Sequence, residues 1–326
     1  MGYVFVYYAH SGFDGAHPGS SGSREELNRL QTAKYALAKV RSGRRQAIHD
    51  YCNVFLKARS EISEASRVDI PRSKVLILGC GYNYPDVVLW STVSSDIVGV
   101  DVRKTFWRNG FRALRRDFRQ RGHSLFDSLV RTVTTRGMYH SYYDHLREAS
   151  GLGLDEFRQD IVPYDGVMLP FPDETFDIVC SNAVLEHVAE LPVVSKELRR
   201  VTKPSGVNYH VWHNYFALSG AHVPDELATS HPWGHLLGSP EVIGWMKMIG
   251  TYLNEKLPQE IADTLSCDFV DVRVNQLDRN HRRKGLDDDF AYEGENLLTP
   301  EIEMSLSHYP KEVLLTRAYS FLGIRK

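Results

Sequence analysis

Short, continuous apolar runs separated by helical segments are the feature that most constrains how this chain can fold. The runs cover residues 75–78, 97–100, 176–180 and 207–211. Strands that are apolar on both faces are covered on both faces, as in parallel sheets flanked by helices. The pattern therefore predicts a three-layer, doubly wound α/β sheet. Two further runs, at 313–315 and 318–324, predict a hairpin-like close to the chain.

Composition excludes several other classes of protein. The 326 residues are 42% hydrophobic and 25% charged, which is typical of a globular chain and not of a disordered one. The net charge of −2 provides no overall field for nucleic acid or for an acidic membrane, and the apolar run at 3–9 is too short to span a bilayer. The four cysteines have no zinc or disulfide spacing, so we expect a cytoplasmic protein.

The chain divides into an N-terminal part and one large domain. Residues 1–70 are predicted to form a glycine-rich loop and a helical appendage, with one helix capped by Ser23 and Glu26 and a second after Gly43. Residues 71–326 form the main domain, interrupted by a helical insertion at about 103–157. Residues 103–150 contain eleven basic and four acidic residues, a balance of +7. This insertion is either a solvated helical face or a lid that recognises an anionic acceptor.

A glycine turn follows the first apolar run and predicts a ligand site. Gly79 and Gly81 come directly after the strand at 75–78, and Pro85 suits the first position of a helix. Asp101 ends the next run, where an open α/β sheet places an acid that binds ribose hydroxyls. A dinucleotide site requires a third glycine where Tyr84 stands, so a different nucleoside-containing cofactor is favoured.

Three downstream motifs carry a family resemblance. They are LPFPDETFDIV at 169–179, SNAVLEHV at 181–188 and ELRRVTKPSG at 197–206. Together they resemble the class I S-adenosylmethionine-dependent methyltransferases of the methyltransferase-11 type, over residues 74–212. The resemblance implies a Rossmann-like, seven-stranded sheet whose last strand is antiparallel, S-adenosyl-L-methionine as cofactor, and methyl transfer as the activity.

The resemblance also implies cofactor contacts, residue by residue. The methionine part would lie against the glycine turn, the ribose at the end of the second strand, the adenine beside residues 165 and 166, and the transferred methyl group just past the fourth strand. The residues concerned are Gly79, Cys80, Gly81, Asp101, Val102, Asp165, Gly166, Asn182 and Ala183. Two positions depart from the family pattern, because Ile77 replaces an acid and Asn83 replaces a glycine.

Methyl transfer from a sulfonium requires alignment and exclusion of water, and an alcohol acceptor also benefits from a general base. Histidines after the fourth and fifth strands are the candidates, chiefly His187, His213 and His231. No metal site is predicted, because the histidine spacing fits no familiar ligand pattern and no cysteine joins it. Aromatic residues in the same region, such as Trp212 and Trp233, are equally consistent with core packing and with substrate contact.

The acceptor is expected to be a small or sugar-containing molecule, with an anionic group as a partner for the arginines of the insertion. An RNA methyltransferase is the alternative that would use the insertion's charge differently, although the chain lacks a recognisable RNA-binding module. A non-catalytic protein that keeps the fold is the other alternative, motivated by Ile77 and Asn83. The sequence leaves the oligomeric state open.

Overall fold

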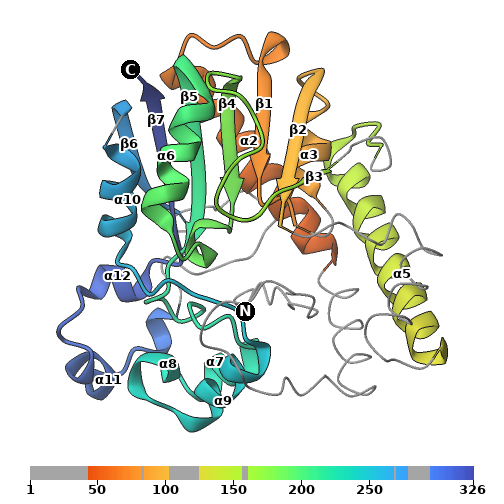
Figure 1. Ribbon diagram of the computed structural model, residues 1–326. Coiled ribbons are helices and arrows are strands. Elements are labelled where there is room, and N and C mark those ends of the chain that lie inside the picture. The colour runs from red at the N-terminus through yellow and green to blue at the C-terminus, as the bar shows by residue number, and fades with distance from the viewer. Residues whose placement is uncertain (1–42, 82–83, 103–124, 156–160, 268, 278–293) are drawn as a thin grey trace.

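Seven strands form one sheet in the order β3-β2-β1-β4-β5-β7-β6 (Figure 1). The computed structural model describes residues 43–81, 84–102, 125–155, 161–267, 269–277 and 294–326. The strands are β1 (Lys74–Leu78), β2 (Asp96–Asp101), β3 (Ile161–Pro163), β4 (Phe176–Asn182), β5 (Thr202–His213), β6 (Phe269–Leu277) and β7 (Ala318–Arg325).

Strand directions confirm the predicted topology. β1 pairs in parallel with β2 on one side and with β4 on the other, and β4 continues in parallel to β5. β7 inserts between β5 and β6 and is antiparallel to both. The sheet is therefore the class I methyltransferase form of the Rossmann-like fold, with its last strand antiparallel. The parallel strands β1 to β5 bring their carboxyl ends to one edge, where ligands bind in such sheets.

Helices cover both faces and complete three layers. One face packs against α2 (Leu56–Ala65) and α3 (Pro85–Trp90), and the other against α6 (Leu191–Val201) and α10 (Pro258–Ser266). Alternation along β1 explains this, since Val75 and Ile77 enter the first core while Leu76 and Leu78 enter the second. The continuous apolar run is thus divided between two cores.

The predicted second N-terminal helix is observed, and it packs on a face of the sheet. Residues 43–65 are helical, with a π-helical segment η1 (Asp50–Phe55) between 43–49 and α2. Phe55 and Ile62 are fully buried in the same core as Ile77 of β1. The expected first helix, with Ser23 and Glu26, lies outside the described residues, and the division at residue 70 remains a prediction.

The insertion is helical where it is described. Helix α5 (Leu125–Ser150) runs along the flank beyond β3 (Figure 1). Its end is tied to the N-terminal helix, because the buried hydroxyl of Tyr142 donates to Oδ2 of Asp50 at 2.5 Å. The arginines at 112, 115, 116 and 119, on which the lid hypothesis depends most, lie outside the described residues. Arg147 is described, and its guanidinium pairs with Asp144 at 3.1 Å.

The predicted terminal hairpin is wrong. Residues 313–315 lie in helix α12 (Lys311–Leu315), and β7 pairs instead with β5 and with β6, a strand that the apolar runs did not predict. β6 is an edge strand whose valines alternate with polar residues and are partly exposed. Its signal is therefore alternation with a period of two residues and not a continuous run.

Small helices gather beyond the carboxyl ends of the parallel strands (Figure 1). They are η4 (Leu185–His187), α7 (Asp225–Ser230), α8 (Gly234–Leu237), α9 (Pro240–Ile249), η5 (Glu295–Leu297) and α11 (Pro300–Ser305); the remaining short helix, η2 (Ile70–Arg72), precedes β1. Trp233 is fully buried against Leu306, Leu314 and Leu315, which favours the core-packing interpretation of this aromatic residue. None of the described helices combines the length and the apolarity needed to cross a bilayer.

Candidate functional site

The glycine turn after β1 is built by backbone geometry that side chains would prevent. Gly79 and Gly81 both adopt positive φ angles, 64° and 69°, which L residues rarely adopt. A Cβ on Gly79 would lie 2.4 Å from Cγ2 of Val184, so the turn also packs tightly against the segment after β4. The amides of Gly79 and Cys80 both donate to the carbonyl of Val100, at 2.8 and 3.2 Å. The turn is therefore fixed to the end of β2.

Asp101 has a structural contact that the sequence did not predict. The amide of Gly81 donates to Oδ2 of Asp101 at 2.8 Å, and the aspartate is buried. The residue is thus at the strand end, as predicted, but it also holds the glycine turn in place. A substitution at Asp101 removes this contact together with any contact to a ribose.

The residues expected near the adenine also come together. A Cβ on Gly166 would lie 3.2 Å from Cγ1 of Val102, so the ends of β2 and β3 are adjacent here. Oδ1 of the exposed Asp165 accepts the amides of Val167 and Met168, at 2.8 and 2.7 Å. These two backbone bonds lower the pKa of Asp165, which keeps it ionised.

Asp86 is a candidate that the sequence analysis missed. It lies in the first turn of α3, directly after the glycine turn, and its side chain hydrogen-bonds with Asn182 at the end of β4. Its Oδ1 is buried and meets no hydrogen-bond partner among the described residues. Burial raises the pKa of Asp86 to about 6, and the Asn182 contact opposes this rise. A buried acid with a spare acceptor is suited to a cation.

A second cluster gathers where β4 and β5 end. The carboxyl of Glu186, in η4, faces Nδ1 of His213 at 3.5 Å. The ring of His222 lies 5.1 Å from the ring of His187 and 5.4 Å from that of His213, measured between centroids. We call these four residues the Glu186 cluster. Two of the three histidines proposed from sequence as bases, His187 and His213, therefore lie in one place.

Two members of the Glu186 cluster, Glu186 and His222, are buried and have side-chain polar atoms without a hydrogen-bond partner among the described residues. Glu186 is 2% exposed, and neither of its oxygens has a hydrogen-bond partner in the described part of the chain. Burial raises the pKa of Glu186 to about 8. Burial also lowers the pKa of His213 and of His222, so their imidazoles are neutral and keep a lone pair.

Hydrogen bonds from Asn254 and a positive φ angle at His222 describe how the Glu186 cluster is held in place. Asn254, in the loop after α9, donates from Nδ2 to the carbonyl of Leu185 at 2.7 Å and from its own amide to the carbonyl of Glu186 at 2.9 Å. His222 has a φ of 54°, an unfavourable angle for a non-glycine residue. Such positions are held by the surrounding structure and occur often at functional sites.

The remaining histidines lie elsewhere or have local partners. Nε2 of His231 pairs with Glu241 at 3.5 Å, so the structure does not bring this third candidate base into the Glu186 cluster. His210 lies between Ser181 and Asn208, with hydrogen bonds of 2.8 and 3.1 Å, and burial lowers its pKa to about 3. His235 donates to the carbonyl of Tyr215 at 2.8 Å.

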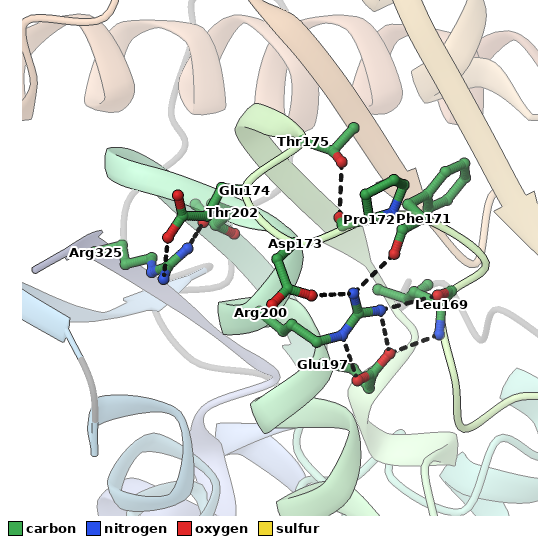
Figure 2. Close-up of polar contacts among 10 residues, drawn as sticks. All are labelled: Leu169, Phe171, Pro172, Asp173, Glu174, Thr175, Glu197, Arg200, Thr202 and Arg325. Atoms are coloured by element: carbon green, nitrogen blue, oxygen red, sulfur yellow. Dashed lines mark hydrogen bonds and ion pairs between the residues drawn. The ribbon is translucent and has the colours of Figure 1, made fainter.

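The segments at 169–176 and 197–200, which belong to the motifs of the resemblance, have a structural explanation, shown in Figure 2. Arg200, near the end of α6, bonds both oxygens of Glu197 at 2.8 Å, the carbonyls of Phe171 and Leu169, and Asp173. The amide of Leu169 donates to Glu197 at 2.9 Å. This set, which we call the Arg200 network, ties the segment before β4 to α6. The LPFPDETF and ELRR segments therefore fix the fold next to the site.

Comparison with known proteins tests the resemblance directly. Residues 139–209 match the family model described as a methyltransferase domain, Methyltransf_11. This segment includes Asp165, Asn182 and Glu186, whereas the glycine turn and Asp101 precede it.

Short local matches to curated proteins agree with the family match. The chain is 55% identical over 38 residues to an uncharacterized methyltransferase of Schizosaccharomyces pombe, which is 12% of this chain and 14% of that protein. It is 50% identical over 42 residues to a demethylmenaquinone methyltransferase of Streptomyces griseus, 13% and 18% of the two chains. The matched segments thus span less than a fifth of these relatives.

Solved structures resemble the chain more broadly but at low identity. An S-adenosylmethionine-dependent methyltransferase from Mesorhizobium loti aligns with 82% of this chain and 98% of its own, at 11% identity and a TM-score of 0.40. A phosphoethanolamine N-methyltransferase from Haemonchus contortus aligns with 83% and 52%, at 14% identity and a TM-score of 0.41. The family match over 139–209 therefore agrees with the resemblance seen in the sequence, and the strand order of the sheet, with β7 antiparallel, is the one that this resemblance implies.

Proposed function

We propose that this chain transfers a methyl group from S-adenosyl-L-methionine to a small-molecule acceptor. The observation that carries the proposal is the bond from the Gly81 amide to Asp101, which joins the glycine turn to the end of β2. Methionine and ribose parts of one cofactor would lie on these two elements, at the edge where open α/β sheets bind ligands. Val102 and Gly166, which are in near contact, continue the same edge toward the adenine.

Asp86 supplies the acid that the family pattern lacks at Ile77. Ile77 packs in the same core as Cys80 and Cys180. Burial raises the pKa of both thiols, and the nearby carboxylate of Asp86 adds to the rise. Asp86 therefore lies in the region that an acid at position 77 would reach. Its buried Oδ1 would accept a hydrogen bond from the ammonium group of the cofactor, and Asn182 would orient the carboxylate.

The acceptor would lie on the other side of β4, against the Glu186 cluster. His213 follows β5 directly and has a lowered pKa because it is buried, so it is a neutral imidazole that can accept a proton from an alcohol acceptor. His187 and Glu186 complete the polar wall. An anionic acceptor remains a proposal that rests on the arginine-rich sequence at 103–124, because the described Arg147 is paired with Asp144.

Isothermal titration calorimetry with S-adenosyl-L-methionine tests the cofactor assignment. Asp101→Asn and Asp86→Asn should each raise the dissociation constant of S-adenosyl-L-methionine. The expected loss of binding free energy is about 1–3 kcal/mol, which is the cost of losing a buried polar contact. Asp96→Asn is the matched control, because Asp96 begins the same strand that Asp101 ends, and its side chain is 58% exposed. Failure of the unmodified chain to bind the cofactor would overturn the proposal and favour a non-catalytic binding protein.

A further inference from the structure

The Glu186 cluster has the composition of a metal site, which the sequence analysis did not predict. One carboxylate and three imidazoles converge from η4, from the end of β5 and from the segment that follows it. One ligand atom from each of Glu186, His213 and His222 lies within 4.8 Å of the others. We propose that these three side chains bind a divalent transition metal ion of the zinc class.

The distances suit such an ion. With bonds of about 2.1 Å, neighbouring ligand atoms in a tetrahedral site lie about 3.4 Å apart. Oε1 of Glu186 and Nδ1 of His213 are 3.5 Å apart. The set can therefore close around an ion by small rotations of the side chains, without movement of the backbone segments that carry them.

Unsatisfied buried atoms are the second, independent observation. Both oxygens of Glu186 and both ring nitrogens of His222 are buried, with no hydrogen-bond partner among the described residues. Buried polar atoms are nearly always paired in folded proteins, so such a group requires an explanation. An ion bonded to one oxygen and one nitrogen would satisfy an atom of each side chain at once.

His187 contributes in the way that side chains around metal sites commonly do. Its Nδ1 donates to the carbonyl of Tyr252 at 2.8 Å, which leaves the lone pair on Nε2. Nε2 lies 3.9 Å from Oε1 of Glu186, so it points toward the same cluster. A backbone carbonyl that fixes the tautomer of a ligand histidine is typical of metal centres. His187 is therefore placed as a fourth ligand or as a neighbour that orients Glu186.

The ligand types select the ion. Imidazole suits zinc, copper, iron and nickel, whereas magnesium and calcium prefer an oxygen-only set. Three protein ligands and an open position are the usual arrangement of a catalytic zinc ion, and four are usual in a structural one. The site lies at the proposed acceptor side. With an ion bound, His213 would be a metal ligand and no longer a proton acceptor, and the ion would instead hold and polarise an acceptor oxygen there. This last step rests on the proposed function, whereas metal binding itself does not.

Metal binding is tested on the full chain with zinc and cobalt. The purified protein is stripped with a chelator and titrated with Co²⁺, whose visible absorption reports coordination by protein ligands. We expect one equivalent to bind, to be displaced by Zn²⁺, and to raise the Tm as the metal concentration rises. Cofactor calorimetry, run separately, tests the proposed function, so failure of one proposal is distinguishable from failure of the other.

Two variants and a control locate the ion. Glu186→Gln keeps the side-chain shape and His222→Gln replaces a single imidazole. Each should weaken binding at least as much as the about 10- to 100-fold loss that changes around a ligand cause. His308→Ala, at an exposed histidine outside the Glu186 cluster, should leave the affinity unchanged. Absence of stoichiometric binding, or equal affinity in both cluster variants and the unmodified chain, would overturn the proposal. If one variant fails to fold, the other and the titration of the unmodified chain decide the outcome.

Discussion

Two polar clusters adjoin β4, and they differ in how well their groups are paired. Before the strand, the Arg200 network gives both oxygens of Glu197 a donor, and each of its described contacts joins a hydrogen-bond donor to an acceptor (Figure 2). After the strand, the Glu186 cluster buries the carboxyl group of Glu186 and the ring of His222, whose polar atoms have no hydrogen-bond partner in the described part of the chain. A paired network stabilises a fold, whereas unpaired buried groups cost free energy and persist at functional sites.

Substitutions in the Glu186 cluster, which follows β4, should lower the rate of methyl transfer. In the metal-free protein, His213→Ala should lower kcat by about 10²–10⁴, the usual contribution of acid–base assistance, whereas it should change the free energy of unfolding much less. His231→Ala is the matched control, because this histidine pairs with Glu241 outside the Glu186 cluster. Rates are measured with the methyl-labelled cofactor once an acceptor is found. A large loss of kcat in His231→Ala with none in His213→Ala would reverse the assignment.

Substitutions in the Arg200 network, which joins the segment before β4 to α6, should lower the stability of the fold. Arg200→Met removes the donor to the carbonyls of Leu169 and Phe171 and leaves Glu197 with the amide of Leu169 alone. It should lower the free energy of unfolding by about 3 kcal/mol. Urea denaturation measures the change. Lys311→Met, which breaks an exposed pair with Glu303, should change the same quantity by less than about 0.5 kcal/mol. Equal losses in the two variants would mean that the network is no more than surface charge pairing.

Asp86 is a buried acid with an unpaired oxygen among the described residues, and it is also proposed to bind the cofactor. Its substitution should therefore have opposite effects on stability and on cofactor binding. Its pKa is raised from 3.8 to about 6, so the folded chain binds the proton more tightly than the unfolded chain. Stability of the cofactor-free protein should therefore fall as pH rises from about 4 to about 6. Asp86→Asn should remove this slope and stabilise the cofactor-free protein at pH 7.5 by about 1–3 kcal/mol.

Cofactor affinity should respond to pH in the other direction. The ammonium group requires the ionised carboxylate, so affinity should rise as pH increases through about 6 in the unmodified chain. The Asp86→Asn variant should bind more weakly and show a flatter profile. Calorimetry at several pH values measures both. An unchanged profile in the variant would show that Asp86 does not contact the cofactor.

The smallest expected effect comes from replacing Glu186 by methionine, the residue that also replaces Arg200 in the variant above. Glu186→Met, measured with a chelator present, should raise the free energy of unfolding by about 1 kcal/mol, because it removes two buried oxygens that have no hydrogen-bond donor in the described chain. Arg200→Met introduces the same residue and should do the opposite. A loss in both variants would mean that the Glu186 cluster is stabilising and that its pairing is better than the structure indicates.

The sequence by itself determined the central strands of the sheet and the residues proposed to bind the cofactor at its edge. Continuous apolar runs predict β1, β2, β4 and β5 because strands buried on both faces need no polar alternation. Gly79, Gly81 and Asp101 were recognisable because a glycine turn and a strand-terminal acid are local in sequence. The edge strand β6 was missed, since its partly exposed valines alternate with polar residues. The short runs at 313–315 and 318–324 did not indicate which of them was helical.

Only the tertiary structure decided which distant side chains meet. Asp86 and Asn182 are far apart in the chain, and their contact depends on α3 starting beside the end of β4. The Glu186 cluster draws on residues 186, 187, 213 and 222, and no spacing rule could separate these histidines from His231 or His210. Parallel strands bring the residues after them to one edge regardless of sequence separation. Burial there, which sets the pKa values and leaves atoms unpaired, is a property of the packed fold and not of the motif.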